Sequence, residues 1–268
     1  MLDKNITSFK NPQVKNVIAL RERKEREKSK LTIVEGAREI GCAFKAGVEF
    51  KEVYVCREFF GDRGQQGIVK ELELKKVKVF ETTKEIFEKI SFGDRHEGVL
   101  AVCRQPSQAL RDLKVSDSSL FVIVEKIEKP GNLGAILRSC DGAGVDGLII
   151  CEGATDLYNP NAVRASLGTI FSVKVVESSN EKTLAFLKEN GVKAFATTPT
   201  AATVYTQADF KNSAAIILGS EQEGLSDFWI NHCDIKVKIP MRGKADSLNV
   251  STTAALVIYE ALRQRGVS

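Results

Sequence analysis

The second half of the chain alternates short apolar runs with amphipathic segments. Three of the runs are continuous: LFVIV at 120–124, GLIIC at 147–151 and AAIIL at 214–218. Continuous apolar strands are typical of a parallel sheet that is covered on both faces, because a face open to water would impose alternation. Further strands are expected at 172–176, 193–197 and 235–239, and helices at 132–143, 161–167 and 181–190. The pattern therefore predicts an open α/β fold with a parallel sheet.

The first hundred residues carry a smaller version of the same alternation. The first helix is expected to start at Asn11-Pro12, a cap followed by a first-turn proline. Strands are expected at 31–35, 53–56, 76–81 and 99–103, and helices at 12–28, 37–46, 67–74 and 84–90. The polar stretch that follows lacks a core pattern and is interpreted as a connection. We predict a small α/β domain over residues 1–105, a linker over 106–119 and a larger α/β domain over 120–268.

The last stretch of the chain combines a polar loop with a buried helix. Residues 239–249 contain Pro240, Gly243 and a run of small polar residues, which predicts a loop. From 250 to 265 the apolar residues recur at three- and four-residue spacing, and Ser251 can satisfy a first-turn amide. A loop rich in backbone donors that leads into a helix N-terminus suits an anionic or polar ligand.

Two more strands of the larger domain end in loops of similar composition. EKIEKPGNLGAILRS follows the strand at 120–124, and GSEQEGLS follows the strand at 214–218. The carboxyl ends of parallel strands meet at one edge, where α/β sheets bind ligands. The first loop lacks both G-x-G-x-x-G and a G-K-[ST] ending, and the chain has no G-x-S-x-G. These absences argue against a dehydrogenase, a kinase and an α/β-hydrolase.

Composition and charge further restrict the class of protein and the kinds of site that the chain can contain. A hydrophobic share of 43% and a charged share of 28% are those of a globular protein, and no apolar run reaches the length of a membrane span. The N-terminus lacks a signal-peptide core, so a cytoplasmic protein is expected. Six scattered cysteines without a CxxC pair predict free thiols, and two histidines without ligand-spaced neighbours argue against a metal site. The net charge of +4 is modest, but RERKEREKSK at 21–30 is either a solvated helix or an arm that lies on phosphates.

Three motifs in the larger domain carry a family resemblance. They are N-x-G-A-x-x-R-S at 132–139, L-G-S-E-x-E-G-L at 218–225 and I-P-M-x-G-x-x-x-S-L-N-V-S at 239–251. In this order and spacing they resemble the SpoU (TrmH-like) family of RNA 2′-O-ribose methyltransferases, which belongs to the SPOUT class. NPxVK at 11–15 and VEGAREI at 34–40 resemble the substrate-binding domain of members that act on ribosomal RNA. The resemblance implies a trefoil-knotted SPOUT domain with a parallel sheet, preceded by a smaller L30e-like α/β domain.

The resemblance implies S-adenosylmethionine as the methyl donor, bound among the three loops. The residues that match the family's cofactor positions, largely through backbone contacts, are Thr197, Gly219, Ile239, Met241, Ser247 and Leu248. The apolar members of this set also fit ordinary core packing, and an apolar wall is what an adenine ring needs.

Arg138 matches the motif arginine and is the leading catalytic candidate. The family's arginine is often described as the base for the 2′-hydroxyl, but a guanidinium scarcely loses its proton in proteins. We therefore expect Arg138 to hold a phosphate and to stabilise the developing alkoxide. Asn132 and Asn249 can orient the ribose or its phosphate. Glu221 can order the active-site loop or a partner subunit's contacts, and Ser247 can bond the nucleophile or the cofactor.

The expected substrate is ribosomal RNA of the large subunit, and the family resemblance also implies a homodimer. Candidate phosphate contacts are Lys15, Arg23, Lys24, Arg38, Lys129 and Arg164. Three alternatives stay open: a transfer-RNA ribose methyltransferase, a SPOUT enzyme that methylates a base, and a non-catalytic RNA-binding protein of the ribosomal-protein type. Because the motif loops all follow Leu120, a fragment that starts near Ser107 is expected to fold and bind the cofactor without the first domain.

Overall fold

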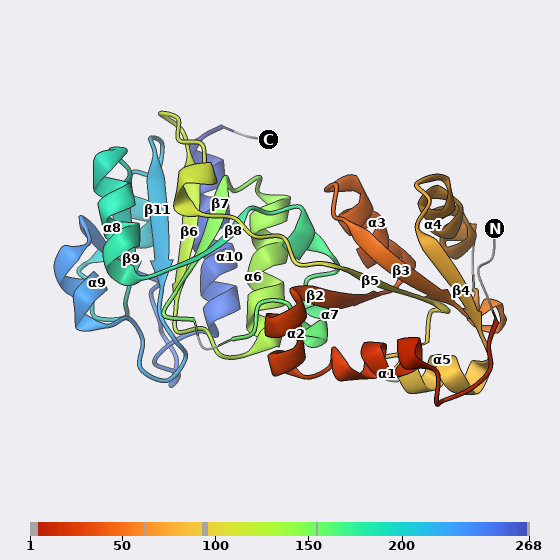
Figure 1. Cartoon of the computed structure of the whole chain (residues 1–268). Coiled ribbons are helices and arrows are strands. Elements are labelled where there is room, and N and C mark those ends of the chain that lie inside the picture. Colours follow the sequence, from red (N-terminus) through yellow and green to blue (C-terminus); the bar gives the residue numbers. More distant parts are fainter. Residues whose placement is uncertain (1–4, 62, 93–95, 154, 267–268) are drawn as a thin grey trace. The chain divides into compact units, whose positions relative to one another are not determined.

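The computed structural model describes residues 5–61, 63–92, 96–153 and 155–266 of the chain (Figure 1). The first four residues of the predicted N-terminal domain lie outside this range. The chain divides into two compact units, each with its own sheet. The first unit contains Met1–Pro106 and Asp156–Ser172, and the second contains Ser107–Thr155 and Val173–Ser268.

The first unit is a five-stranded sheet with helices on both faces. Its strands, in sheet order, are β1 (Asn5–Ile6), β4 (Lys78–Thr82), β3 (Phe50–Val55), β5 (Val99–Arg104) and β2 (Leu31–Glu35). β5 runs antiparallel to its neighbours β2 and β3, and the other pairs are parallel. Helices α3 (Ala37–Lys45) and α4 (Arg63–Leu74) cover one face, and α1 (Pro12–Ala19) and α5 (Lys84–Ile90) cover the other (Figure 1). Val14, Val17, Tyr54, Phe87 and Leu100 lie in the core beneath α1 and α5.

The second unit is built on a seven-stranded sheet in which every pairing is parallel. The strands, in sheet order, are β10 (Thr203–Val204), β12 (Ile235–Lys238), β9 (Lys193–Thr197), β11 (Ala214–Leu218), β6 (Leu120–Glu125), β7 (Gly147–Cys151) and β8 (Val175–Ser178). The helices are α6 (Pro130–Gly142) and α10 (Val250–Gln264) on one side of the sheet, and α8 (Asn180–Glu189) and α9 (Asp227–His232) on the other (Figure 1). All residues of β6, β7 and β11 are buried, as their continuous apolar runs predicted.

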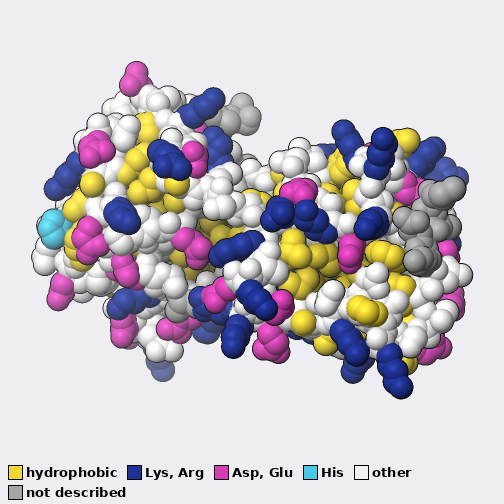
Figure 2. Space-filling model, viewed as in Figure 1, with side chains coloured by type: hydrophobic (Ala, Val, Ile, Leu, Met, Phe, Trp, Pro, Cys, Tyr) yellow, Lys and Arg dark blue, Asp and Glu magenta, His cyan; other side chains and the backbone are white. Residues whose placement is uncertain are grey.

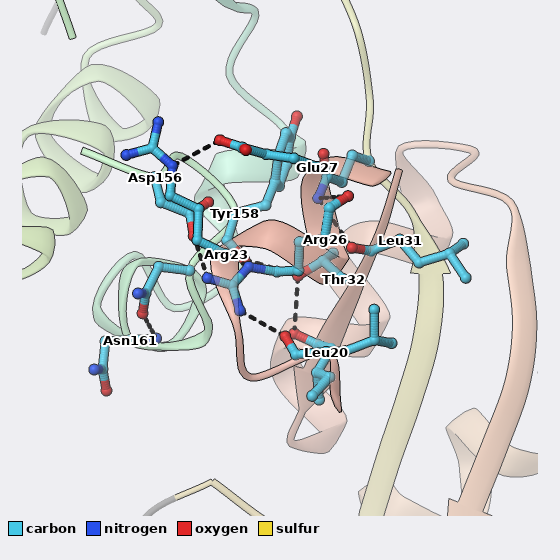
Figure 3. A network of polar contacts seen from close by, with 12 residues as sticks. Leu20, Arg23, Arg26, Glu27, Leu31, Thr32, Asp156, Tyr158 and Asn161 are labelled. Atoms are coloured by element: carbon cyan, nitrogen blue, oxygen red, sulfur yellow. Dashed lines mark hydrogen bonds and ion pairs between the residues drawn. The ribbon is translucent and has the colours of Figure 1, made fainter. Parts of the chain in front are cut away.

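The predicted helix at 12–28 is in fact two helices, α1 and α2 (Arg23–Ser29). The interpretation of 21–30 as a solvated or phosphate-bound arm is also incomplete, because the Arg26 side chain is 1% exposed and forms an ion pair with Asp156. Thr32 donates to the carbonyl of Tyr158 at 2.9 Å in the same region (Figure 3). A buried cation of this kind persists only with a matched partner.

The observed units depart from the predicted boundaries in two places. The expected linker, apart from Pro106, belongs to the second unit, where Leu113 packs in the core. Residues 156–172, expected in the larger domain, belong to the first unit and include α7 (Pro160–Ala165) and the 3-10 turn Thr169–Phe171. A fragment that starts at Ser107 would carry this segment without its partners and would expose Ile170 and Phe171, both of which are buried here. The fragment is therefore a poor test of the second unit alone.

Within the described residues, no helix has the length and apolarity to cross a bilayer. The six cysteines are free, and four of them are buried.

Candidate active site

Four loops of the second unit meet at the carboxyl edge of its parallel sheet. Three of them, after β9, β11 and β12, line a cavity of about 590 Å³ together with the first turns of α10. A cavity of this size holds a drug-sized ligand or a cofactor. All six cofactor candidates line it: Thr197, Gly219, Ile239, Met241, Ser247 and Leu248. The six candidates from separate strands and loops thus lie around one cavity, while the loop after β6 does not line it.

The cavity wall combines apolar side chains with exposed backbone. Leu218 and Val237 are buried in their strands and form part of the wall beside Ile239 and Met241. Thr197 Oγ1 donates to the carbonyl of Ile217 at 2.9 Å, so this hydroxyl is tied to the next strand. Such a surface suits a flat aromatic ring on its apolar part and a polar tail along the loops.

Gly219 is required by the shape of its own loop. Ser220 and Gly224 exchange backbone hydrogen bonds of 3.0 and 3.1 Å, which fold the loop after β11 back on itself. A Cβ on Gly219 would lie 2.1 Å from the carbonyl carbon of Gly224, closer than atoms can approach. Gly224 itself has φ of +70°, which glycine adopts without strain. The two glycines thus hold Glu221 at the tip of a tight turn.

Glu221 is the centre of a polar network that joins all three motifs. Its Oε1 accepts from Asn132 Nδ2 at 2.7 Å and from Asn249 Nδ2 at 2.6 Å, and its Oε2 accepts from Lys129 Nζ at 2.5 Å. Asn249 Nδ2 also lies 3.2 Å from Asn132 Oδ1. Asn132 and Asn249 alone are 117 positions apart in the chain, so the network ties together the loops that follow β6, β11 and β12.

The charge of Glu221 is fixed by these donors. The bond from Lys129, followed by the bond from Asn132, holds the pKa of the Glu221 carboxyl below its ordinary value. A carboxylate whose oxygens already accept three hydrogen bonds is a weak base. Glu221 therefore links the loops through its hydrogen bonds and is poorly suited to take a proton.

Asn249 has a second task as the N-cap of α10. Its Oδ1 accepts from the Ser251 amide at 2.9 Å, which satisfies a free donor of the first turn. With its oxygen directed to α10 and its amide nitrogen to Glu221, the side chain is fixed at both ends. This arrangement sets the start of α10 relative to the cavity.

Arg138 lies on α6 away from the cavity wall. Its side chain is exposed, and no described residue forms a hydrogen bond or an ion pair with it. Asn132, in the first turn of the same helix, also does not line the main cavity but borders a smaller pocket with Lys129 and Glu221. The structure thus brings Asn132, Glu221 and Asn249 together and leaves Arg138 outside the group.

The predicted phosphate contacts differ in their availability. Lys15, Lys24 and Arg38 are exposed. Arg23 pairs with Glu27 at 2.7 Å, and Lys129 pairs with Glu221 while keeping 67% of its side chain exposed. Arg164 is half-buried and donates to the carbonyl of Phe92 at 2.7 Å, which gives it a structural task in the first unit.

The motifs did not point to the loop after β9, which lines the cavity beyond Thr197. Thr198, Pro199 and Thr200 follow β9 and line the cavity, as does Tyr205. The signal was present, because the strand at 193–197 ends at the same edge of the parallel sheet as the other three. A second lysine–carboxylate pair, Lys126 with Glu223 at 3.1 Å, was also missed.

The motif order and the cavity geometry agree with comparisons to known proteins. The sequence profile described as SpoU rRNA Methylase family matches residues 119–259, which is more than half of the chain. The chain belongs to the SpoU rRNA Methylase family. A second profile, described as MRM3-like substrate binding domain, matches residues 11–101 of this SpoU-family chain.

Similar proteins extend over nearly the whole SpoU-family chain. A solved structure described as an RNA 2′-O ribose methyltransferase is 38% identical, with a TM-score of 0.87 over 98% of this chain and 100% of that chain. The SpoU methyltransferase AviRb from Streptomyces viridochromogenes, solved with the cofactor AdoMet, is 27% identical, with a TM-score of 0.87 over 96% of this chain and 100% of that chain. The 23S rRNA (guanosine(2553)-2′-O)-methyltransferase RlmP of Bacillus subtilis (strain 168) is 27% identical over 96% of this chain and 98% of its own length.

Proposed function

We propose that this SpoU-family chain transfers a methyl group from S-adenosylmethionine to the 2′-hydroxyl of a ribose in the RNA of the large ribosomal subunit. The observation that carries the proposal is the cavity at the carboxyl edge of the second sheet, which all six cofactor candidates line. Two of the similar proteins named above are RNA 2′-O-methyltransferases by their descriptions, and the third, a SpoU methyltransferase, was solved with AdoMet.

The residues of the cavity fit the proposed cofactor. The apolar wall formed by Ile239, Met241 and Leu248 matches an adenine ring, and the polar loops at 197–200 and 219–225 match a ribose and a zwitterionic tail. The sulfonium of the bound donor supplies an activated methyl group and its own leaving group. The protein therefore needs no general acid, and its task is to place the ribose oxygen in line with the methyl group.

The Glu221 network performs this positioning. Glu221 accepts a hydrogen bond from each of Asn132, Lys129 and Asn249. These bonds hold the loops in place before the RNA binds. Preorganised polar groups lose little conformational freedom when the substrate arrives. Ser247, which lines the cavity beside Leu248 and makes no hydrogen bond to a described residue, is free to contact the reacting hydroxyl or the cofactor.

The proposal includes a homodimer in which Arg138 serves the partner's cavity. Arg138 is exposed, forms no hydrogen bond or ion pair with a described residue and does not line the cavity of its own subunit. On α10, which packs against α6, Leu256 is 38% exposed and Tyr259 is 48% exposed. An exposed apolar helix face beside an unused arginine fits a two-fold interface that completes each site with the other copy's guanidinium. The trefoil knot is part of the same proposal and rests on the family resemblance.

Methyl transfer from tritiated S-adenosylmethionine tests the function. The substrates are protein-free RNA of the large subunit, RNA of the small subunit and transfer RNA, all without prior modification. Label that enters large-subunit RNA and survives as an alkali-resistant dinucleotide supports the proposal. Label in transfer RNA alone, label on a base, or cofactor binding without transfer to any RNA contradicts it.

Mixing two inactive variants tests the shared site. Arg138→Ala removes the guanidinium, and Leu248→Trp fills the cavity. If Arg138 acts in the partner's cavity, mixed dimers regain activity, because one site then has both an intact cavity and an intact arginine. Activity that stays absent after subunit exchange would mean that each chain completes its own site.

A further inference from the structure

One edge of the first unit's sheet gathers residues that the proposed reaction does not use. β1, β4 and β3 run parallel, so residues 7–10, 83–84 and 56–60 all follow carboxyl ends at the same edge. β5 runs antiparallel to β3, so residues 96–98, which precede it, lie at this edge as well. The edge therefore combines parts of four loops that are far apart in the sequence.

Aromatic rings and cations lie together at this edge, where Arg57 also pairs with Glu81 at 3.4 Å. The Phe59 and His96 ring centroids are 5.2 Å apart. Lys84 Nζ lies 5.7 Å from the centroid of the Phe59 ring, and Arg57 Cζ lies 6.0 Å from that of Phe60. Phe59, Phe60 and His96 are half-buried, so each ring keeps part of its surface open. Figure 2 shows exposed hydrophobic side chains among Lys and Arg side chains on one face of this unit.

The rings are held in place from below. Gly98 has φ of +75°, and a Cβ there would lie 2.6 Å from the Cys56 carbonyl oxygen and 2.7 Å from Phe60 Cδ1. Only a glycine therefore lets the 96–98 backbone pass so close beneath the aromatic pair. The ring of Phe59 also packs at 5.8 Å from that of Phe87, which is fully buried. These contacts fix the rings before any ligand arrives, which reduces the entropic cost of binding.

One ring nitrogen of His96 has no hydrogen-bond partner in the described part of the chain. This atom, Nδ1, is buried. If the ring served only for packing, an apolar ring would do so without the free-energy cost of burying a nitrogen that lacks a hydrogen bond.

We propose that Phe59 and His96 form a stacking platform for an unpaired base of the RNA substrate, with Lys84 and Arg57 placed near its phosphates. The proposal rests on the proposed RNA methyltransferase function and deepens it, because it assigns a recognition site to the first unit. Aromatic rings recognise single-stranded RNA by stacking on bases that a duplex keeps covered. Rings with cations beside them match a single strand, which presents both unpaired bases and phosphates.

Fluorescence titration of the full-length protein tests the platform. The probe is a ten-nucleotide oligoadenylate with a central 2-aminopurine, and a ten-base-pair RNA duplex serves as the comparison. Loss of one stacked base weakens binding by about 5- to 100-fold. His96→Ala and Phe59→Leu are each expected to raise the Kd of the single strand within this range and to abolish 2-aminopurine quenching. His96→Tyr, which restores a ring, is expected to recover most of the affinity.

The matched control lies at the opposite edge of the same sheet. Phe44 and Phe50 are a half-buried pair with ring centroids 6.5 Å apart, at the end of α3 and the start of β3. Phe44→Leu should leave the Kd unchanged, which separates stacking from a general loss of stability. Equal weakening by Phe44→Leu, or an unchanged Kd in both His96→Ala and Phe59→Leu, would overturn the platform. S-adenosylmethionine binding, measured by calorimetry, reports separately on the proposed function, because no platform residue lines the cofactor cavity.

Discussion

Replacing Asp156 by Asn tests whether the buried ion pair holds the first unit together. Arg26 is 1% exposed, and Nε donates to Asp156 Oδ2 at 3.1 Å, while Nη1 donates to the Leu20 carbonyl at 2.5 Å (Figure 3). Asp156 is 15% exposed, so water can hardly replace its charge. The substitution keeps an acceptor oxygen but leaves the guanidinium without a counter-charge. Removing one member of a buried pair costs about 3–5 kcal/mol, and the retained acceptor places Asp156→Asn near the lower end, at about 3 kcal/mol.

The same helix provides the control for this substitution. Arg23 and Glu27 form an i,i+4 pair on α2 with exposed fractions of 54% and 58% (Figure 3). Exposed pairs of this spacing contribute about 0.3–0.5 kcal/mol, because water and salt screen the charges. Glu27→Gln should therefore change the free energy of unfolding by about one sixth as much as Asp156→Asn.

Hydrogen exchange and tryptophan fluorescence measure the stability of the two units separately. Trp229, the one tryptophan, is buried in the core of the second unit, so its fluorescence reports on that unit during a urea titration. Peptides from β2 and α7, which contact each other in the first unit, report the loss of amide protection in that unit. We expect faster exchange of these peptides in Asp156→Asn and unchanged exchange in Glu27→Gln. Equal effects of the two substitutions would refute the argument that burial decides the strength of the pair.

Three further predictions concern the active site and pH. Arg138→Ala should abolish methyl transfer and leave S-adenosylmethionine affinity within about twofold, because the guanidinium acts on the transition state; calorimetry and tritium transfer on one preparation separate the two effects. Glu221→Gln removes the charge that Lys129 and both asparagines share, so kcat/KM should fall by about 10- to 100-fold while the secondary structure by circular dichroism stays unchanged; unchanged kinetics would reduce the network to loop packing. Burial raises the pKa of Glu35 to about 7. The folded state therefore binds the Glu35 proton more tightly than the unfolded state does. The stability that this proton contributes is fully present below about pH 4.5 and is lost as the pH rises to about 7. Glu35→Gln should therefore stabilise the protein by up to about 3 kcal/mol at about pH 8 and have little effect at about pH 4, as measured by urea titration. Equal effects at the two pH values would contradict the raised pKa of Glu35 in the folded state.

The sequence by itself determined most strands of the second unit and the sheet edge at which its motif loops meet. β7, β9 and β11 begin and end at the predicted residues, whereas the strand expected at 172–176 is Val175–Ser178 and β10 was not predicted. β7 and β11 are buried on both faces and are therefore apolar throughout, so their polar neighbours mark their ends. The three motif loops could be assigned to one edge because parallel strands share a direction. The cavity residues therefore followed from local pattern, motif and sheet direction together.

Only the tertiary structure decided which charged residues are buried and what they bind. The segment 21–30 has the composition of a solvated helix, and its periodicity does not show that Arg26 meets Asp156, 130 residues later. The same holds for residues 156–172, which lie among strands of the second unit in sequence but pack in the first. A local pattern records which face of an element is apolar, whereas the partner that neutralises a buried charge is set by contacts between distant segments. For this reason the Glu221 network and the Arg26–Asp156 pair could be found only in the folded chain.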